Sequence, residues 1–308
     1  MFRRPSRVLV IAALAATAAT VAAGCEAKVY GTPPAPVSPA LTVVAPLGSM
    51  APLPEAPPGE PPAGFTGLDV REHQATADAA SDGAKIIALI LDRSTGQMVS
   101  NGNTTAMPIA SVAKLFIADD LLLQESKNQT ELSPADRQQL DVMLRSSDDD
   151  AANTFWNRSG GSAIITRVAA RYGLSSTTTP YDGNWWNTMS TAADLVRYYD
   201  MLLDGRGGLP PERASIILSN LSQSTPNGID GYPQRFGIPD GLPAESVAVK
   251  QGWMCCWGGG NWMHMSTGVI GLDRRYVMVI GSMQPVDDAE ARQTITQAVK
   301  TMFPTGRI

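Results

Sequence analysis

The 308-residue sequence predicts an α+β fold in which strands from the two ends of the folded domain form one sheet. A run of buried-strand type occupies 85–91, and after a turn a second extended run follows at 97–100. Three further extended runs lie near the C-terminus, at 246–250, 262–270 and 276–283. Helical patterns fill the sequence between these two groups. We therefore expect a sheet flanked by helices, with a helical subdomain inserted between its N-terminal and C-terminal strands.

Helices are expected where apolar residues recur every three or four positions. These segments are 108–123, 133–145, 162–172, 191–203, 211–222 and 287–303. Ser133 and Pro134 have the residue types of an N-cap and a first helical position. The three aspartates at 148–150 suit either a solvated turn or a helix N-terminus. The polar stretch 173–189 is long enough either to carry function or to lack order.

The first residues have the features of an export signal rather than of a folded element. Three arginines precede an apolar stretch at 8–23, and Gly24-Cys25 follows it. This ending resembles a bacterial lipobox, in which Cys25 becomes the lipidated first residue after cleavage. Ala22 departs from the larger aliphatic residue that is usual there, and an ordinary secretory signal with a coincidental cysteine is the alternative. We expect a lipoprotein signal peptide at 1–24.

The segment that follows, 25–64, is rich in proline and alanine. Because proline lacks an amide proton and resists helix and central strand alike, we expect an extended tether. A folded domain at 65–308 would then be held on the extracytoplasmic face of the cell membrane through the lipid anchor. The net charge of −5 argues against a nucleic-acid partner.

Ser111 and Lys114 stand three positions apart at the start of an apolar helix, so their side chains can touch. Lys114 is the only charged residue between Arg93 and Asp119. An ammonium in apolar surroundings loses hydration, which lowers its pKa and favours the free amine. Such an amine can activate a serine hydroxyl as a nucleophile without histidine. A surface serine beside a lysine that reaches solvent is the alternative.

Histidine chemistry is not favoured by this sequence. Of the two histidines, His73 precedes the first expected strand and His264 lies within the extended run 262–270. Neither has the surroundings of a catalytic triad, and so few histidines disfavour a zinc hydrolase. We therefore expect no metal ion and no cofactor.

Three motifs occur in order along the chain: Ser111-Val-Ala-Lys114, Ser147-Asp148-Asp149 and Lys250-Gln251-Gly252. They resemble the Ser-x-x-Lys, Ser-Asp-Asn and Lys-Thr-Gly motifs of the serine β-lactamase and penicillin-binding-protein superfamily. The resemblance covers roughly 86–302 and is nearest to the class A β-lactamases. It implies an antiparallel sheet, a helical subdomain and acyl-serine chemistry. As a lipidated, proline-tethered member, the chain is similar to actinobacterial lipoproteins.

The resemblance also implies a role for each motif residue. Ser111 would be the acylated nucleophile and Lys114 its proton partner, while Ser147 would relay a proton to the leaving nitrogen. Lys250 would supply positive potential for a substrate carboxylate. Four further positions would contact the substrate: Asp149, Gln251, Gly252 and Met254. The backbone amides of Met254 and Ser111 would form the oxyanion hole.

Departures from the motifs argue against efficient β-lactam turnover. Gln251 replaces the motif threonine and lacks its hydroxyl. Asp149 replaces an asparagine, so it cannot donate to a substrate carbonyl and could keep a neighbouring lysine charged. No glutamate occurs between Glu131 and Glu212, although class A enzymes use one to activate the deacylating water. Asp182 is the only carboxylate in 160–189, and we expect it to cap a turn rather than to act in catalysis.

The distance along the chain between the first two motifs is also unusual. Ser147 follows Ser111 by only 36 positions, which is several helical turns shorter than in class A enzymes. A segment at the rim of the cleft is therefore expected to be missing.

Five of the six tryptophans border the expected cleft and either fill the core or form an aromatic wall for a ligand. They are Trp185, Trp186, Trp253, Trp257 and Trp262. Cys255 and Cys256 lie among them. They are expected either to pair, with each other or between molecules, or to remain as buried free thiols. A ring between adjacent cysteines would be strained, because their Cα atoms are only about 3.8 Å apart.

The sequence as a whole predicts a lipid-anchored cell-envelope protein that lacks efficient β-lactam turnover. It would bind a peptidoglycan-related or other envelope ligand, or a partner protein. The alternative is a slow acyl-serine hydrolase or carboxypeptidase-like enzyme that uses Ser111 and Lys114.

Overall fold

The computed structural model describes residues 65–128 and 131–308. The expected signal peptide, the lipidated Cys25 and the proline-rich tether lie outside the described residues. In the part of the chain that is described, every helix is too short or too polar to cross a lipid bilayer.

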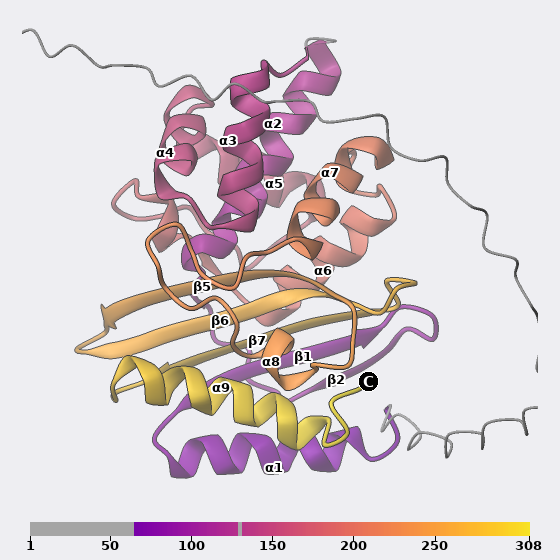
Figure 1. Ribbon diagram of the computed structural model, residues 1–308, viewed down its shortest axis with the longest axis vertical. Coiled ribbons are helices and arrows are strands. Elements are labelled where there is room, and N and C mark those ends of the chain that lie inside the picture. Colours follow the sequence, from indigo (N-terminus) through magenta and orange to yellow (C-terminus); the bar gives the residue numbers. More distant parts are fainter. Residues whose placement is uncertain (1–64, 129–130) are drawn as a thin grey trace, which may run out of the picture. The chain divides into compact units, whose positions relative to one another are not determined.

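Five strands form an antiparallel sheet in the order β2-β1-β7-β6-β5 (Figure 1). β1 (Lys85–Asp92) and β2 (Gln97–Ser100) form an N-terminal hairpin. The C-terminal strands are β5 (Val247–Trp257), β6 (Asn261–Ile270) and β7 (Tyr276–Gln284). β1 pairs with β7 along its whole length, so the last strand of the chain lies beside the first. The expected α+β class and the assembly of the sheet from both ends of the domain are confirmed.

Helices cover both faces of this sheet (Figure 1). α1 (Leu68–Ser81) and α9 (Asp288–Met302) lie on one face, where Ile295 and Val299 join the core that contains Ile280 of β7. α1 was not expected from the sequence. Two of its buried side chains are alanines and one is a glutamate, which together give only a weak apolar pattern. It is ordered by packing against α9, which is more than 200 positions away in the chain.

The other face of the sheet carries the helical subdomain. Its helices are α2 (Lys114–Asn128), α3 (Pro134–Arg145), α4 (Asp149–Arg158), α5 (Ala163–Tyr172), α6 (Ala192–Leu203) and α7 (Pro211–Ser222). Shorter elements complete it: the 3₁₀ turns η1 (Ala110–Ala113) and η2 (Trp185–Asn187), and the strands β3 (Met107–Pro108) and β4 (Met189–Ser190). The one-turn helix α8 (Ile238–Gly241) lies on the other face, where Ile238 joins the core formed with α1 and α9.

Side chains cap the N-termini of two of these helices in the way that the sequence suggests. The Ser133 side chain accepts a hydrogen bond from the amide of Asp136 at the start of α3. Asp148 caps α4 in the same way, accepting from the amide of Ala151. Of the two interpretations of the three aspartates, the helix N-terminus is therefore the one found.

β5 continues to Trp257, well beyond the strand end expected at Lys250. It pairs with β6 residue by residue as far as Met254 opposite Met263. Gly252 weakens the local strand signal, but pairing within a sheet outweighs that preference.

A buried acidic residue ties three helices of the subdomain together. Asp119 on α2 has no exposed surface and forms an ion pair with Arg171 on α5. The hydroxyls of Tyr172 on α5 and Tyr198 on α6 also donate to its carboxylate. Burial raises the pKa of Asp119, while the Arg171 guanidinium opposes that shift.

Replacement of Asp119 by alanine should lower the free energy of unfolding by about 3–5 kcal/mol, because it leaves the Arg171 cation without its buried partner. Urea denaturation followed by circular dichroism measures this loss. Glu131→Ala is the matched control, since the Glu131 side chain is 85% exposed, and it should cost less than about 1 kcal/mol. Equal losses in the two variants would contradict a structural role for Asp119.

Candidate active site

Ser111 lies in the turn η1, which leads directly into α2. Lys114 is the first residue of α2, and its Nζ atom donates a hydrogen bond to Ser111 Oγ at 2.9 Å. Ser111 is 7% exposed and Lys114 is completely buried. The alternative of a surface serine beside a lysine that reaches solvent is therefore excluded.

The other two motifs reach the same point from distant parts of the chain. Ser147 lies between α3 and α4, and its hydroxyl accepts hydrogen bonds from Lys114 Nζ at 3.2 Å and from Lys250 Nζ at 2.9 Å. The Ser147 carbonyl accepts a further bond from Lys114 at 2.6 Å. Lys250 projects from β5 and is also buried. The four side chains expected to carry the chemistry thus form one hydrogen-bonded group between the sheet and the helical subdomain.

Gly252 allows β5 to approach the serine closely. A Cβ atom at this position would lie 2.5 Å from the carbonyl oxygen of Ile109 and 3.4 Å from the amide nitrogen of Ser111. A larger residue would force the strand and η1 apart, because backbone atoms cannot yield as a flexible side chain can. The absence of a side chain at Gly252 therefore leaves room for β5 to lie close to η1.

Both lysines have perturbed pKa values. Burial lowers the pKa of Lys114, and the carboxylate of Asp149, whose Oδ1 atom lies 2.5 Å from Nζ, opposes that shift. Burial also lowers the pKa of Lys250 far below its ordinary value, and repulsion from Lys114 adds to the effect. The buried pair thus favours release of a proton, while Asp149 favours its retention on Lys114.

Gln251 does not take the expected position beside a substrate. Successive side chains of a strand point to opposite faces, so Gln251 points away from the face that carries Lys250. Its buried amide donates to the carbonyl oxygens of Gln234 and Phe236 at 3.0 and 2.6 Å. The side chain therefore holds the segment that precedes α8 and is not among those that line the cleft.

A cleft of about 110 Å³ opens beside the serine. The residues that line it are Ala110, Ser111, Asp149, Trp185, Trp186, Asp230, Trp253 and Met254. Met254 and three of the tryptophans take the expected place, whereas Trp257 and Trp262 do not line this cleft. Asp230 was not anticipated, because it lies in a loop without a motif; a lone acidic residue between glycines carries no signal that sequence reasoning could use.

Asp182 belongs to the long loop before α6 but not to the cleft lining. Its carboxylate accepts hydrogen bonds from the backbone and side chain of Asn184 and from the side chain of Asn187. The arrangement is the turn cap that the sequence predicted in preference to a catalytic role.

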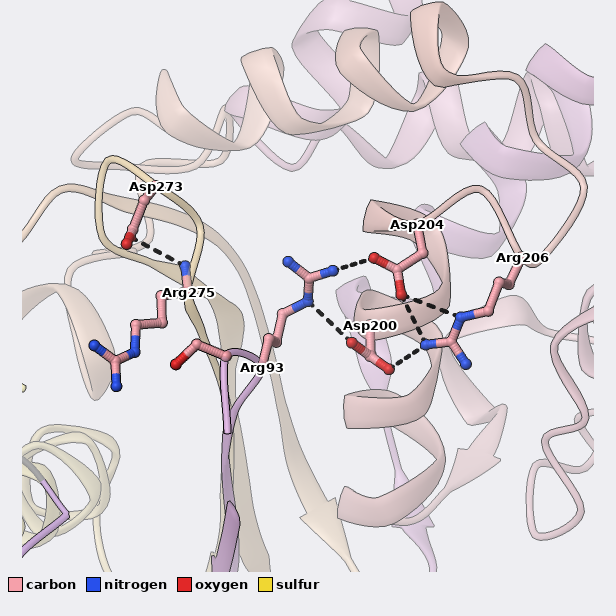
Figure 2. A pocket seen from close by; sticks show the side chains of 7 residues that line it. Arg93, Asp200, Asp204, Arg206, Asp273 and Arg275 are labelled. Carbon is pink, nitrogen blue, oxygen red and sulfur yellow. Dashed lines mark hydrogen bonds and ion pairs between the residues drawn. The ribbon is translucent and has the colours of Figure 1, made fainter. Parts of the chain in front are cut away.

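A second, larger cavity of about 390 Å³ lies away from the motifs, and Figure 2 shows its charged lining. Arg93 pairs with Asp200 and Asp204, and Arg206 pairs with the same two carboxylates. Arg275 pairs with Asp92, outside the residues that line the cavity. Since each of these three arginines already has a carboxylate partner, the cavity offers a ligand no free cation from residues 65–128 and 131–308.

The cysteines and the potential metal ligands were also located. Cys255 and Cys256 are exposed and joined to each other by a disulfide, so the alternative of buried free thiols is not found. In the described residues, His, Cys, Asp and Glu side chains nowhere gather in threes as a metal site would require.

Comparison with known proteins places this geometry in a family. The model of the β-lactamase enzyme family matches residues 129–304. Proteins named "Putative lipoprotein LppW" from Mycobacterium tuberculosis and Mycobacterium bovis are 58% identical to this chain over 315 residues, covering 99% of it and all of the relative.

Solved structures agree on the fold. The extended-spectrum β-lactamase TLA-1 superposes with a TM-score of 0.64 at 13% identity, over 78% of this chain and 99% of that one. A β-lactamase from Chitinophaga pinensis superposes with a TM-score of 0.61 at 15% identity, over 75% and 97%. The motif-based resemblance is confirmed: the chain belongs to the β-lactamase enzyme family.

Proposed function

We propose that this protein is a lipid-anchored envelope protein whose Ser111 accepts an acyl group from an amide or lactam carbonyl and releases it slowly. The observation that carries the proposal is the 2.9 Å contact between Lys114 Nζ and Ser111 Oγ, both buried at the cleft. Ser147 and Lys250 extend this contact into a connected path for protons.

Attack of the serine on a carbonyl carbon is the step that these residues support. The free amine of Lys114 takes the hydroxyl proton as Ser111 Oγ bonds to the carbon. The C–N bond then breaks, and the Ser147 hydroxyl passes a proton from Lys250 or Lys114 to the leaving nitrogen. The backbone amides of Ser111 and Met254 would face the developing negative charge.

Slow release follows from the carboxylates near the cleft. Hydrolysis of an acyl-serine needs a base that activates water, and the loop before α6 offers only Asp182, which caps its own turn. Asp149 lines the cleft but is paired with Lys114. Asp230, the other carboxylate of the described lining, belongs to the loop before α8 and not to the loop that carries the water-activating glutamate of class A enzymes, so the acyl adduct should persist.

Incubation with benzylpenicillin should increase the intact mass of the wild-type protein by the mass of one whole penicillin. The adduct should remain for minutes or longer after excess penicillin is removed. Ser111→Ala, which removes only the hydroxyl, should show no adduct. A folded wild-type protein that stays unmodified after long incubation with several β-lactams would exclude acyl transfer from these compounds.

Asp149→Asn should speed acylation at neutral pH and move its pH profile to lower pH. The Asp149 charge raises the pKa of Lys114, so its removal lets the free amine form at lower pH. Rates of labelling by a fluorescent penicillin between pH 5 and 9 measure the change. Asp150→Asn, an exposed neighbour outside the cleft lining, is the control and should leave the profile in place. A slower Asp149→Asn protein would mean that Asp149 assists rather than restrains the lysine.

Binding without chemistry is the second candidate function, and one observation favours it. The 2.5 Å contact between Asp149 and Lys114 stabilises the charged lysine, which cannot act as a base. A peptidoglycan-related or other envelope ligand, or a protein, would then occupy the cleft without a covalent bond. This candidate expects that Ser111→Ala retains the biological phenotype and that the mass experiment shows no adduct.

The lipid anchor is proposed from the sequence around Cys25 and from the name of the mycobacterial relatives. Expression of the full chain in a mycobacterial host with an alkyne-tagged fatty acid should label the wild type. Cys25→Ser should remove the label and release the protein from the membrane fraction, because a membrane anchor requires buried acyl chains. An unlabelled wild type would favour the ordinary secretory signal.

A further inference from the structure

The candidate cleft is lined by carboxylates and tryptophans, and none of its described lining side chains is cationic. Asp149 and Asp230 supply the carboxylates, and both residues are exposed. Trp185, Trp186 and Trp253 supply aromatic surface. Carboxylates and aromatic rings in one cleft form surroundings that favour a positive charge.

The two lysines beneath the cleft, Lys114 and Lys250, do not neutralise both Asp149 and Asp230. Lys114 and Lys250 are buried, and the Lys114 ammonium is already paired with Asp149. Burial holds the pKa of Lys250 far below its usual value, so this side chain favours the neutral form. Asp230 accepts a hydrogen bond from the Tyr232 amide at 3.0 Å and forms no ion pair within the described residues. Asp230 acts on the Lys114 ammonium only at longer range, where it raises the pKa of that group, so one exposed carboxylate of the cleft has no ion-pair partner within the described residues.

Contacts on both sides hold the loop that carries Asp230. The amide of Ile229 donates to the carbonyl of Ser146 at 2.7 Å, which joins the loop to the residue before the second motif. The Tyr232 ring stacks on Trp253 with centroids 4.4 Å apart and planes 7° from parallel. Asp230 and the Trp253 ring are therefore placed by the same short segment.

The opposite aromatic wall is also fixed before any ligand arrives. Trp185 Nε1 donates to Asn153 Oδ1 at 2.9 Å, and Trp186 meets the Trp185 ring edge to face at 5.2 Å. Lys114 Nζ lies 4.6 Å from the centroid of Trp185, so that ring already accepts one cation. Because the rings are held in place, little side-chain entropy is lost when a ligand binds.

We propose that this cleft selects ligands that carry a primary or quaternary ammonium group, bound at the Asp230 carboxylate against the tryptophan rings. An ammonium is attracted by the carboxylate and by the aromatic faces, whereas a free carboxylate on the ligand is repelled by Asp230. An extension of this proposal rests on the proposed acyl transfer. In that case the acyl donor carries its ammonium group close to the reacting carbonyl.

The first test measures binding alone and does not depend on acyl transfer. Tryptophan fluorescence of the mature wild-type protein is titrated with choline and with its uncharged isostere 3,3-dimethyl-1-butanol. Choline should bind at least about fivefold more tightly, and Asp230→Asn should remove that difference. Asp150→Asn, an exposed carboxylate outside the cleft lining, should retain it. Equal affinities for the two probes, or a preference that survives Asp230→Asn, would overturn the proposal.

The second test compares acylation by ampicillin and by benzylpenicillin, which differ by one ammonium group in the side chain. The ratio of their second-order rate constants should favour ampicillin about fivefold in the wild type and fall towards one in Asp230→Asn. A ratio unchanged by Asp230→Asn would overturn the extension to acyl donors. If neither compound acylates a folded protein, the acyl-transfer proposal fails for β-lactams and the choline titration alone decides the ammonium site.

Discussion

The buried ammonium group of Lys114 joins two distant parts of the chain at a single atom. Nζ lies within hydrogen-bond distance of the Ser111 hydroxyl in its own helix start, and of the Ser147 carbonyl, the Ser147 hydroxyl and the Asp149 carboxylate before and at the start of α4. Its three N–H groups are thus shared among four acceptors. Lys250 adds the sheet to this group through the Ser147 hydroxyl. Since a buried ammonium without partners costs several kcal/mol, the three segments must come together whenever Lys114 is buried. The fold and the candidate site therefore depend on the same contacts.

The protonation states of the two lysines also decide between the two candidate functions, acyl transfer to Ser111 and binding of a ligand without a covalent bond. Dehydration favours the free amine on both side chains, and their mutual repulsion reinforces this at Lys250. Asp149 opposes the effect on both side chains, most directly on Lys114, with which it is paired. An asparagine at this position would accept the same hydrogen bond without its negative charge. The one-atom difference between amide and carboxylate thus changes how readily Lys114 can act as a base while leaving the packing of the site nearly unchanged.

The parts that sequence reasoning predicted are those that depend on short distances along the chain. Ser111 and Lys114 meet because three positions make one helical turn, and the Ser133 cap follows from a local preference. Features that depend on contacts between distant parts of the chain were not predicted. The alanine-rich α1 is ordered by α9, and the direction of Gln251 follows from the phase of β5 within the sheet. Residues far away in the chain determine where α1 and the Gln251 side chain lie. A local sequence pattern does not contain that information.

The departures from the family motifs point in one direction when the lining is considered as a whole. Gln251 withdraws a polar group from the cleft and Asp149 replaces a neutral donor by an anion, while Asp230, which lies outside the motifs, is a second carboxylate of the lining. Random loss of function would not be expected to spare Lys114 and Lys250, because burying two ammonium groups near each other lowers stability and apolar replacements would raise it. The proton-transfer group is present while the charge around it is changed. Such a pattern is the one expected from a change in the kind of ligand rather than from decay of the site.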